Sequence, residues 1–151
     1  LILMTAKVGC GSIMALAPEG EITDPETLEA SLKEELLGTF PPALLGRIVS
    51  IPYVPLSAGV LAGITQLKLG SVARRMRGAH GTQLVWDDAV IDHIVAQCRD
   101  PDSGGRMIDN IITNSILPDL SRQVLSRMVS GEAMSDVTIK VSDGGFAYGF
   151  A

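Results

Sequence analysis

The sequence predicts an α+β fold in two parts, and three observations lead to this prediction. Hydrophobic residues make up 46% of the 151 residues and recur at helical spacing in several long stretches. Short apolar or alternating segments bounded by Gly and Pro predict strands between and after these helices. The chain divides at about Tyr53-Val54-Pro55. We therefore expect a remnant of an α/β layer in residues 1–54, followed by residues 55–151 with helices packed on a small antiparallel sheet.

The first element is an apolar run, Leu1-Ile2-Leu3-Met4, that has neither the basic region nor the cleavage site of a signal peptide. Four consecutive apolar residues predict a fully buried strand of a parallel sheet. Because such a strand needs neighbouring strands, we expect this chain to be cut from a longer one.

A helix is predicted to follow, beginning at Thr23-Asp24-Pro25-Glu26, which offers a capping side chain, a first-turn proline and a capping-box glutamate. Leu28, Leu32 and Leu36 form its apolar face. The helix should stop near residues 40–42, because a residue before proline is disfavoured in the α region. The next segment, residues 48–51, is predicted to be a strand.

The second part opens with a helix that has Ser57 as its N-cap and that Gly78 and Gly81 close. Its last turns carry Arg74, Arg75 and Arg77, which suit the negative end of the helix dipole. The predicted apolar stripe consists of Val60, Leu61, Ile64, Leu67, Val72 and Met76.

Residues 83–86 predict a short strand, and Asp87 should cap the helix that follows it. The predicted buried face of that helix is Val90, Ile91, Ile94, Val95 and Cys98. After a turn at residues 100–105, a long helical pattern runs to Met128, and Pro118 should kink it. Residues 137–150 alternate around a glycine-containing turn and predict a hairpin.

Charge and composition argue against several classes of function. The formal net charge is −5, from 12 basic and 17 acidic residues, and no basic tract is longer than Arg74-Arg75, which argues against nucleic-acid binding. No run approaches the roughly twenty apolar residues of a membrane span. Cys10 and Cys98 have neither disulfide-framework nor zinc-ligand spacing, and they fit a reducing compartment.

Motifs for phosphate and metal chemistry are also absent. The sequence has no G-x-x-x-x-G-K-[ST] loop and no apolar run ending in Asp-Glu that would hold magnesium. We expect His80 to be a surface loop residue and His93 to lie on the side of a helix. Asp87-Asp88 has the composition of a helix N-cap with a first-turn carboxylate, although a pair of carboxylates is also able to hold a cation.

Five segments, spread along nearly the whole chain, are informative when they are taken together and in order. They are Leu1-Ile2-Leu3-Met4-Thr5-Ala6-Lys7-Val8-Gly9, Phe40-Pro41-Pro42-Ala43-Leu44-Leu45-Gly46-Arg47-Ile48, Pro55-Leu56-Ser57, Ile64-Thr65-Gln66-Leu67-Lys68-Leu69 and Ser103-Gly104-Gly105-Arg106-Met107-Ile108. In this order they resemble five motifs of the second ATPase ring of the Clp/Hsp100 AAA+ unfoldases. These motifs are the sensor 1 strand with T-S-N-x-G, F-x-P-x-F-L-N-R-I, the helix start H-P-L-[ST], I-x-x-I-Q-L, and the sensor 2 motif G-A-R.

Four stretches resemble more narrowly the branch of this family that serves bacterial type VI secretion. They are residues 40–47, 51–57, 104–109 and 116–121. The resemblance implies that the chain begins after the Walker motifs and holds the end of the second large AAA+ subdomain plus the small subdomain. It implies a cytoplasmic hexameric ATPase of a Gram-negative bacterium, which uses ATP and Mg²⁺. Its partners would be neighbouring subunits and, through parts outside this chain, the type VI secretion sheath.

The resemblance assigns roles to two arginines. Hydrolysis spreads charge over the γ-phosphoryl oxygens, and a guanidinium from the neighbouring subunit stabilises that charge. Arg47 matches this arginine finger, although the residues alone favour a pair with a local carboxylate. Arg106, with Gly105 before it, matches sensor 2 at a helix N-terminus, where phosphate is favoured. The alternative is a helix-start arginine bonded to Asp109 or Asp102.

Two further positions correspond to nucleotide contacts in the family. Ile64 resembles the adenine-facing residue of the small subdomain, and by spacing alone it is a core residue. Lys7 replaces the sensor 1 asparagine, which both donates and accepts hydrogen bonds, whereas lysine only donates. Lys7 either contacts the γ-phosphate directly or occupies a position that tolerates change in this branch.

Two functions of different class follow. The first is the C-terminal portion of an AAA+ motor that disassembles the contracted sheath. Because the chain alone lacks the Walker A and Walker B motifs, we expect it to be inactive and to hold neither ATP nor Mg²⁺. The second is a non-enzymatic assembly module that packs against adjacent subunits. Coding sequence upstream of Leu1 discriminates between them, because a P-loop and an Asp-Glu motif favour the motor.

Overall fold

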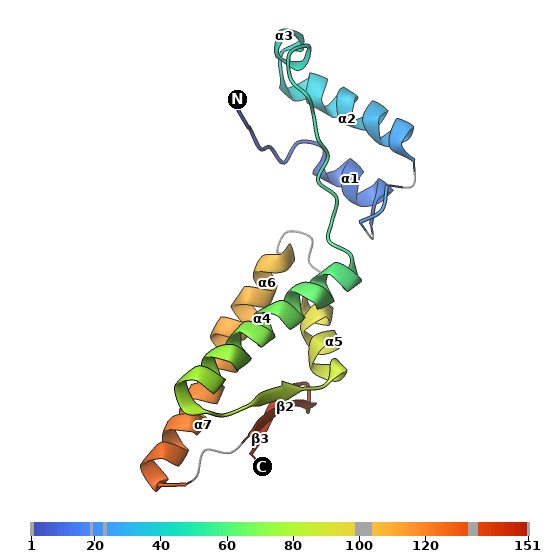
Figure 1. The fold of residues 1–151 in the computed structure, drawn as a ribbon. Helices are drawn as coiled ribbons and strands as arrows, with labels where there is room; N and C mark the ends of the chain where they lie inside the picture. Colours follow the sequence, from blue (N-terminus) through green and yellow to red (C-terminus); the bar gives the residue numbers. More distant parts are fainter. Residues whose placement is uncertain (1, 19, 23, 99–103, 133–135, 151) are drawn as a thin grey trace. The chain divides into compact units, whose positions relative to one another are not determined.

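The structure, a computed structural model, describes residues 2–18, 20–22, 24–98, 104–132 and 136–150 (Figure 1). The chain folds as two compact units, Leu1–Ser57 and Ala58–Ala151. Helices dominate both units, and the strands of the described residues all belong to the second unit. The predicted α+β class is therefore correct for the chain. No helix of the described residues is long and apolar enough to cross a membrane.

In the described residues of the first unit, the helices are α1 (Cys10–Leu16), α2 (Pro25–Thr39) and α3 (Pro42–Leu45). The Asp24 side chain accepts a hydrogen bond from the backbone N–H of Thr27 and so caps α2 as predicted. Helix α2 ends before the two prolines, also as predicted. The small core of this unit consists of Ile13, Leu28 and Leu32, with Leu16 and Val54 packed against it.

Two predicted strands of the first unit are absent from the structure. Residues 2–4 form no strand and are highly exposed, and residues 48–51 also form no strand. The prediction of a buried strand at the start of the chain is therefore wrong for the described residues. The physical reason is the lack of ladder partners, because the first unit contains no strand among its described residues and a lone strand leaves its backbone groups unpaired.

The part of the second unit that the structure describes packs four α-helices and one π-helical segment, η1, around a hydrophobic core. The elements are α4 (Ala58–His80), α5 (Asp88–Gln97), α6 (Gly104–Ile111), η1 (Ile112–Ile116) and α7 (Leu117–Ser130). Asp87 caps α5 by accepting a hydrogen bond from Val90 N–H, as predicted. The C-terminal hairpin is also as predicted, with Asp143 and Gly144 at positive φ in its turn.

The buried face of α4 differs from the predicted stripe. The buried residues are Leu61, Thr65, Leu69, Val72 and Met76. Leu67, which the prediction placed in the stripe, is 73% exposed, whereas Leu69 is fully buried. Thr65 is tolerated inside the core because its hydroxyl donates to the carbonyl oxygen of Leu61 over 2.9 Å.

The sheet contains β1 (Leu84–Trp86), β2 (Val137–Ser142) and β3 (Gly145–Phe150), in that order across the sheet. Strands β2 and β3 form the antiparallel hairpin, but β1 and β2 pair in parallel. The predicted antiparallel sheet is therefore corrected to a mixed one. The reason is the long helical connection between β1 and β2, which is the crossover that a parallel pair requires (Figure 1).

The long helical pattern is interrupted immediately before Pro118, where η1 replaces regular α-helix. Proline has no N–H group, so it cannot bond the carbonyl one turn earlier, and a π turn is one known accommodation. The Tyr148 hydroxyl of β3 donates to the carbonyl oxygen of Ile116 over 3.3 Å. The hairpin thus supplies a donor to a carbonyl at the end of the irregular segment.

Stability of the second unit is expected to fall at high pH through Tyr148. Burial of the ring, followed by the negative charge of Asp119, raises the pKa of Tyr148 to about 12. Because an unfolded tyrosine titrates near 10, the stabilisation is complete below pH about 10 and is lost as the pH rises toward 12. Tyr148 is only half-buried, so solvent screening reduces the expected loss of unfolding free energy to about 1 kcal/mol.

Denaturant unfolding at pH 9 and pH 12 measures this loss. Tyr148→Phe should remove the tyrosine-dependent part of the decline, while Tyr53→Phe, at a position that is 87% exposed, should not. An equal decline in wild type and Tyr148→Phe would refute the assignment to Tyr148.

Candidate functional site

Arg106 lies in the first turn of α6, directly after Gly104 and Gly105. The side chain of Arg106 is exposed, and Gly104 has a positive φ of 44°. The first N–H groups of an α-helix have no acceptor within the helix. A guanidinium beside these donors is an arrangement that binds phosphate or carboxylate oxygens.

The predicted alternative for Arg106, a pair with Asp109, is not observed. The Asp109 carboxylate instead contacts Lys68 of α4, with 2.7 Å between Nζ and Oδ1. Among the described residues, Arg106 forms no ion pair. The other alternative partner, Asp102, and most of the predicted turn at residues 100–105 lie outside the described residues.

Ile64 lies on α4, which packs against α6 in the core of the second unit. Its side chain is half-buried and contacts the core cluster, so part of its surface is covered by protein and part faces solvent. Ile64 and Lys68 are one helical turn apart on α4. The second unit thus brings the helices that carry Ile64, Gly105 and Arg106 into one packed arrangement.

The remaining two predicted site residues belong to the first unit. Lys7 precedes α1, and its carbonyl oxygen accepts from Cys10 N–H over 3.2 Å. Arg47 follows α3, and its backbone N–H donates to the carbonyl of Leu44 over 2.9 Å. Both side chains are exposed, and among the described residues no carboxylate pairs with Arg47. The guanidinium of Arg47 is therefore accessible to an external anion.

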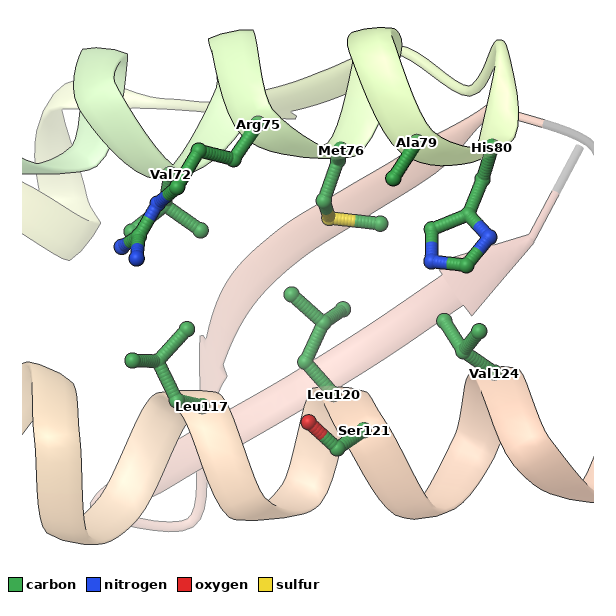
Figure 2. Close-up of a pocket in the computed structure, with 9 residues that line it drawn as sticks. All are labelled: Val72, Arg75, Met76, Ala79, His80, Leu117, Leu120, Ser121 and Val124. Atoms are coloured by element: carbon green, nitrogen blue, oxygen red, sulfur yellow. The ribbon is translucent and has the colours of Figure 1, made fainter.

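A groove of about 220 Å³ lies between α4 and α7 (Figure 2). Met76 and Leu120 face each other across it, and Arg75, His80 and Ser121 supply polar atoms. None of the predicted site residues lines this groove. The groove is thus separate from Arg106 and the start of α6.

Both histidines lie on helices of the second unit. His80 is exposed, as expected of a surface residue, but it is the last residue of α4 and not the loop residue that was predicted. His93 lies on α5 as predicted; its Nε2 is 2.9 Å from Gln97 Nε2, and its ring packs edge-on against Phe146. The described residues contain no group of three His, Cys, Asp or Glu that would hold a metal ion.

Sequence reasoning missed the pairing of Lys68 with Asp109. Both residues occur in segments that had been singled out, but a contact between α4 and α6 leaves no trace in the spacing of either helix. The pairing depends on how the two helices pack. Only the structure reveals that Asp109 is already engaged by another cation.

Comparison with known proteins shows the family to which the chain belongs. Residues 56–139 match the family model of the C-terminal, D2-small domain, of ClpB protein. Over its whole length the chain is 45% identical to the AAA+ ATPase ClpV1 of Pseudomonas aeruginosa, of which it covers 17%. It is 32% identical to the chaperone protein ClpB of Yersinia enterocolitica, with 83% of this chain and 14% of that protein aligned.

A third relative is the chaperone protein ClpB of Bdellovibrio bacteriovorus, 28% identical over 96% of this chain and 16% of that protein. The chain thus spans about a sixth of the length of these curated relatives. The α+β unit with its mixed three-stranded sheet is consistent with an AAA+ small subdomain. The chain belongs to the ClpB D2-small domain family and is a C-terminal part of a ClpB/ClpV-type AAA+ protein.

Proposed function

We propose that this chain is the C-terminal portion of a hexameric ATPase that remodels other proteins by ATP hydrolysis. The observation that carries the proposal is the 45% identity to an AAA+ ATPase over the whole chain. The accessible guanidiniums of Arg47 and Arg106 support it, because both are positions for which the family resemblance implies contact with phosphate. The activity belongs to the full-length protein, in which preceding parts supply the Walker motifs.

The proposed site divides the chemistry between two subunits. Arg106, with Gly105, contacts the nucleotide of its own subunit as sensor 2, and Ile64 faces the adenine. Arg47 reaches the nucleotide of the neighbouring subunit and stabilises the charge on the transferred phosphoryl group. Lys7 occupies the sensor 1 position and donates to the γ-phosphate. Bound ATP and Mg²⁺ supply the reacting group and neutralise its charge.

The proposed substrate is the contracted sheath of type VI secretion, in the cytoplasm of a Gram-negative bacterium. This finer assignment rests on the resemblance of residues 40–47, 51–57, 104–109 and 116–121 to the type VI branch of the family. Parts of the protein outside this chain make the sheath contacts. Neighbouring subunits of the ring are the partners of the chain itself.

ATP turnover by the full-length protein and by the 151-residue chain tests the proposal. We expect turnover by the full-length protein and none by the chain, because catalysis needs the Walker lysine and acid. Turnover by the purified chain would refute this assignment of catalysis to the preceding part. A full-length protein without a P-loop and Asp-Glu motif would refute the ATPase itself.

A non-enzymatic assembly module remains the second candidate. Three large apolar residues near the end of α7, Leu125, Met128 and Val129, are exposed, which favours contact with another protein surface. Assembly and catalysis differ in one measurable respect. If the full-length protein forms rings but neither binds nor hydrolyses ATP, the assembly function replaces the proposed one.

A further inference from the structure

Arg106 and Asp109 are three residues apart on α6, and both side chains are exposed. Residues at this spacing are neighbours on a helix surface, and opposite charges there attract one another. An Arg106–Asp109 pair would occupy the guanidinium that the proposed site needs for phosphate. The local sequence of α6 therefore contains an internal competitor for the nucleotide.

In the structure this competitor is engaged elsewhere. Lys68 of α4 holds the Asp109 carboxylate at 2.7 Å, and no ion pair within the described residues includes Arg106. The exposed fractions of the Lys68 and Asp109 side chains are 47% and 55%, so the pair is a weak contact that is open to exchange. A weak contact of this kind is suited to reducing the attraction between Asp109 and Arg106 without locking either side chain in place.

The packing of α4 on α6 places Lys68 where it meets Asp109. On α4, Leu69 is fully buried next to Lys68, and Thr65 is buried one turn earlier. On α6, Ile108 is fully buried next to Asp109. Lys68 thus precedes a core residue of α4, and Asp109 follows a core residue of α6. Both lie at the solvent edge of the two packed helices.

We propose that Lys68 is a positioning residue, which engages Asp109 and thereby leaves the Arg106 guanidinium available to a nucleotide phosphate. This inference rests on the proposed function, because it assumes that Arg106 contacts the nucleotide. It adds a residue of α4 to the determinants of nucleotide affinity. Lys68 itself touches neither nucleotide nor reacting atoms; it acts through Asp109.

Four full-length proteins test the inference: wild type, Lys68→Met, Asp109→Asn and the double variant. The measurement is the dissociation constant of a fluorescent ADP analogue, together with KM and kcat for ATP. Lys68→Met should weaken binding and raise KM about threefold, because an exposed ion pair is worth under about 1 kcal/mol. The value of kcat at saturating ATP should change less than KM.

Asp109→Asn distinguishes competition from simple bracing of the two helices. This variant also breaks the Lys68–Asp109 contact, but it removes the competing charge, so binding should not weaken. The double variant should bind as Asp109→Asn does. Raising the salt concentration should shrink the effect of Lys68→Met, because the competition is between exposed charges. Lys140→Met, at an exposed lysine of β2, is the matched control and should leave affinity unchanged.

Two outcomes overturn the inference. Equal weakening by Lys68→Met and Asp109→Asn would show that the contact only braces the helices. Unchanged affinity in Lys68→Met would show that Asp109 does not compete. Arg106→Ala separates these failures from failure of the proposed function. If Arg106→Ala leaves nucleotide affinity unchanged, the proposed sensor 2 role is wrong. If Arg106→Ala weakens binding but Lys68→Met does not, only the role of Lys68 is overturned.

Discussion

Arg47→Ala is expected to reduce ATP turnover by the second ring of the full-length protein at least a thousandfold, which is the lower range for arginine fingers. The reason is the loss of the guanidinium that, in the proposed mechanism, stabilises charge in the transition state. Nucleotide binding should persist, because in the proposed mechanism the Arg47 of one subunit acts on the neighbouring subunit only during hydrolysis. Steady-state turnover and binding of a fluorescent ADP analogue measure the two effects separately.

The matched control is Arg74→Ala, which removes an exposed arginine of α4 from outside the proposed site. Its turnover should equal that of the wild type. Arg47→Lys is a second informative variant, because lysine keeps the charge but loses the planar fork of the guanidinium. We expect Arg47→Lys to remain strongly impaired. Wild-type turnover in Arg47→Ala would contradict a role for this residue in hydrolysis.

Leu69→Ala is expected to lower the unfolding free energy of the second unit by about 3–4 kcal/mol, as large-to-small changes in packed cores do. Leu69 is fully buried in the centre of α4 and belongs to the core cluster that α4, α5, α6 and α7 share. Removing its side-chain carbons leaves a cavity that the surrounding helices cannot fill completely. Urea unfolding of the 151-residue chain, monitored by circular dichroism, measures the change.

Leu67→Ala offers a control on the same helix with the same chemical change. Leu67 is 73% exposed, so its replacement should alter the unfolding free energy by less than about 0.5 kcal/mol. The two variants differ only in which face of α4 carries the leucine. Equal destabilisation by both would contradict the observed orientation of the helix.

Elements whose signals are local could be predicted from the sequence. Asp24 and Asp87 cap helices because a side-chain oxygen and a nearby N–H group suffice for a cap. The paired prolines after α2 end it through steric effects on the preceding residue. The hairpin of β2 and β3 follows from alternation around the Asp143-Gly144 turn.

Features that depend on tertiary partners could not be predicted in the same way. Both Leu67 and Leu69 are apolar, and only the helices that pack on α4 decide that Leu69 is buried. The parallel pairing of β1 with β2 depends on the path of the helices between them. Residues 2–4 have the composition of a buried strand, but the described part of the first unit offers no strand to pair with.

In the candidate site, too, local features could be predicted from the sequence and tertiary contacts could not. Arg47 and Arg106 were found through segments that resemble family motifs, and the structure adds that both guanidiniums are exposed. The engagement of Asp109 by Lys68 was not predictable, because it joins two helices whose mutual orientation is set by buried side chains. Sequence reasoning therefore identified the candidate phosphate ligands but not the pairing of Lys68 with Asp109.

The most direct test of the proposed motor is turnover by mixtures of wild-type and Arg47→Ala full-length protein at fixed total concentration. If Arg47 completes the site of the neighbouring subunit, one variant subunit impairs a site that it does not itself contain. Turnover should then fall more steeply than linear dilution with the fraction of Arg47→Ala. Turnover that is independent of the variant fraction would contradict the account, because it would show that Arg47 takes no part in hydrolysis at a neighbouring site.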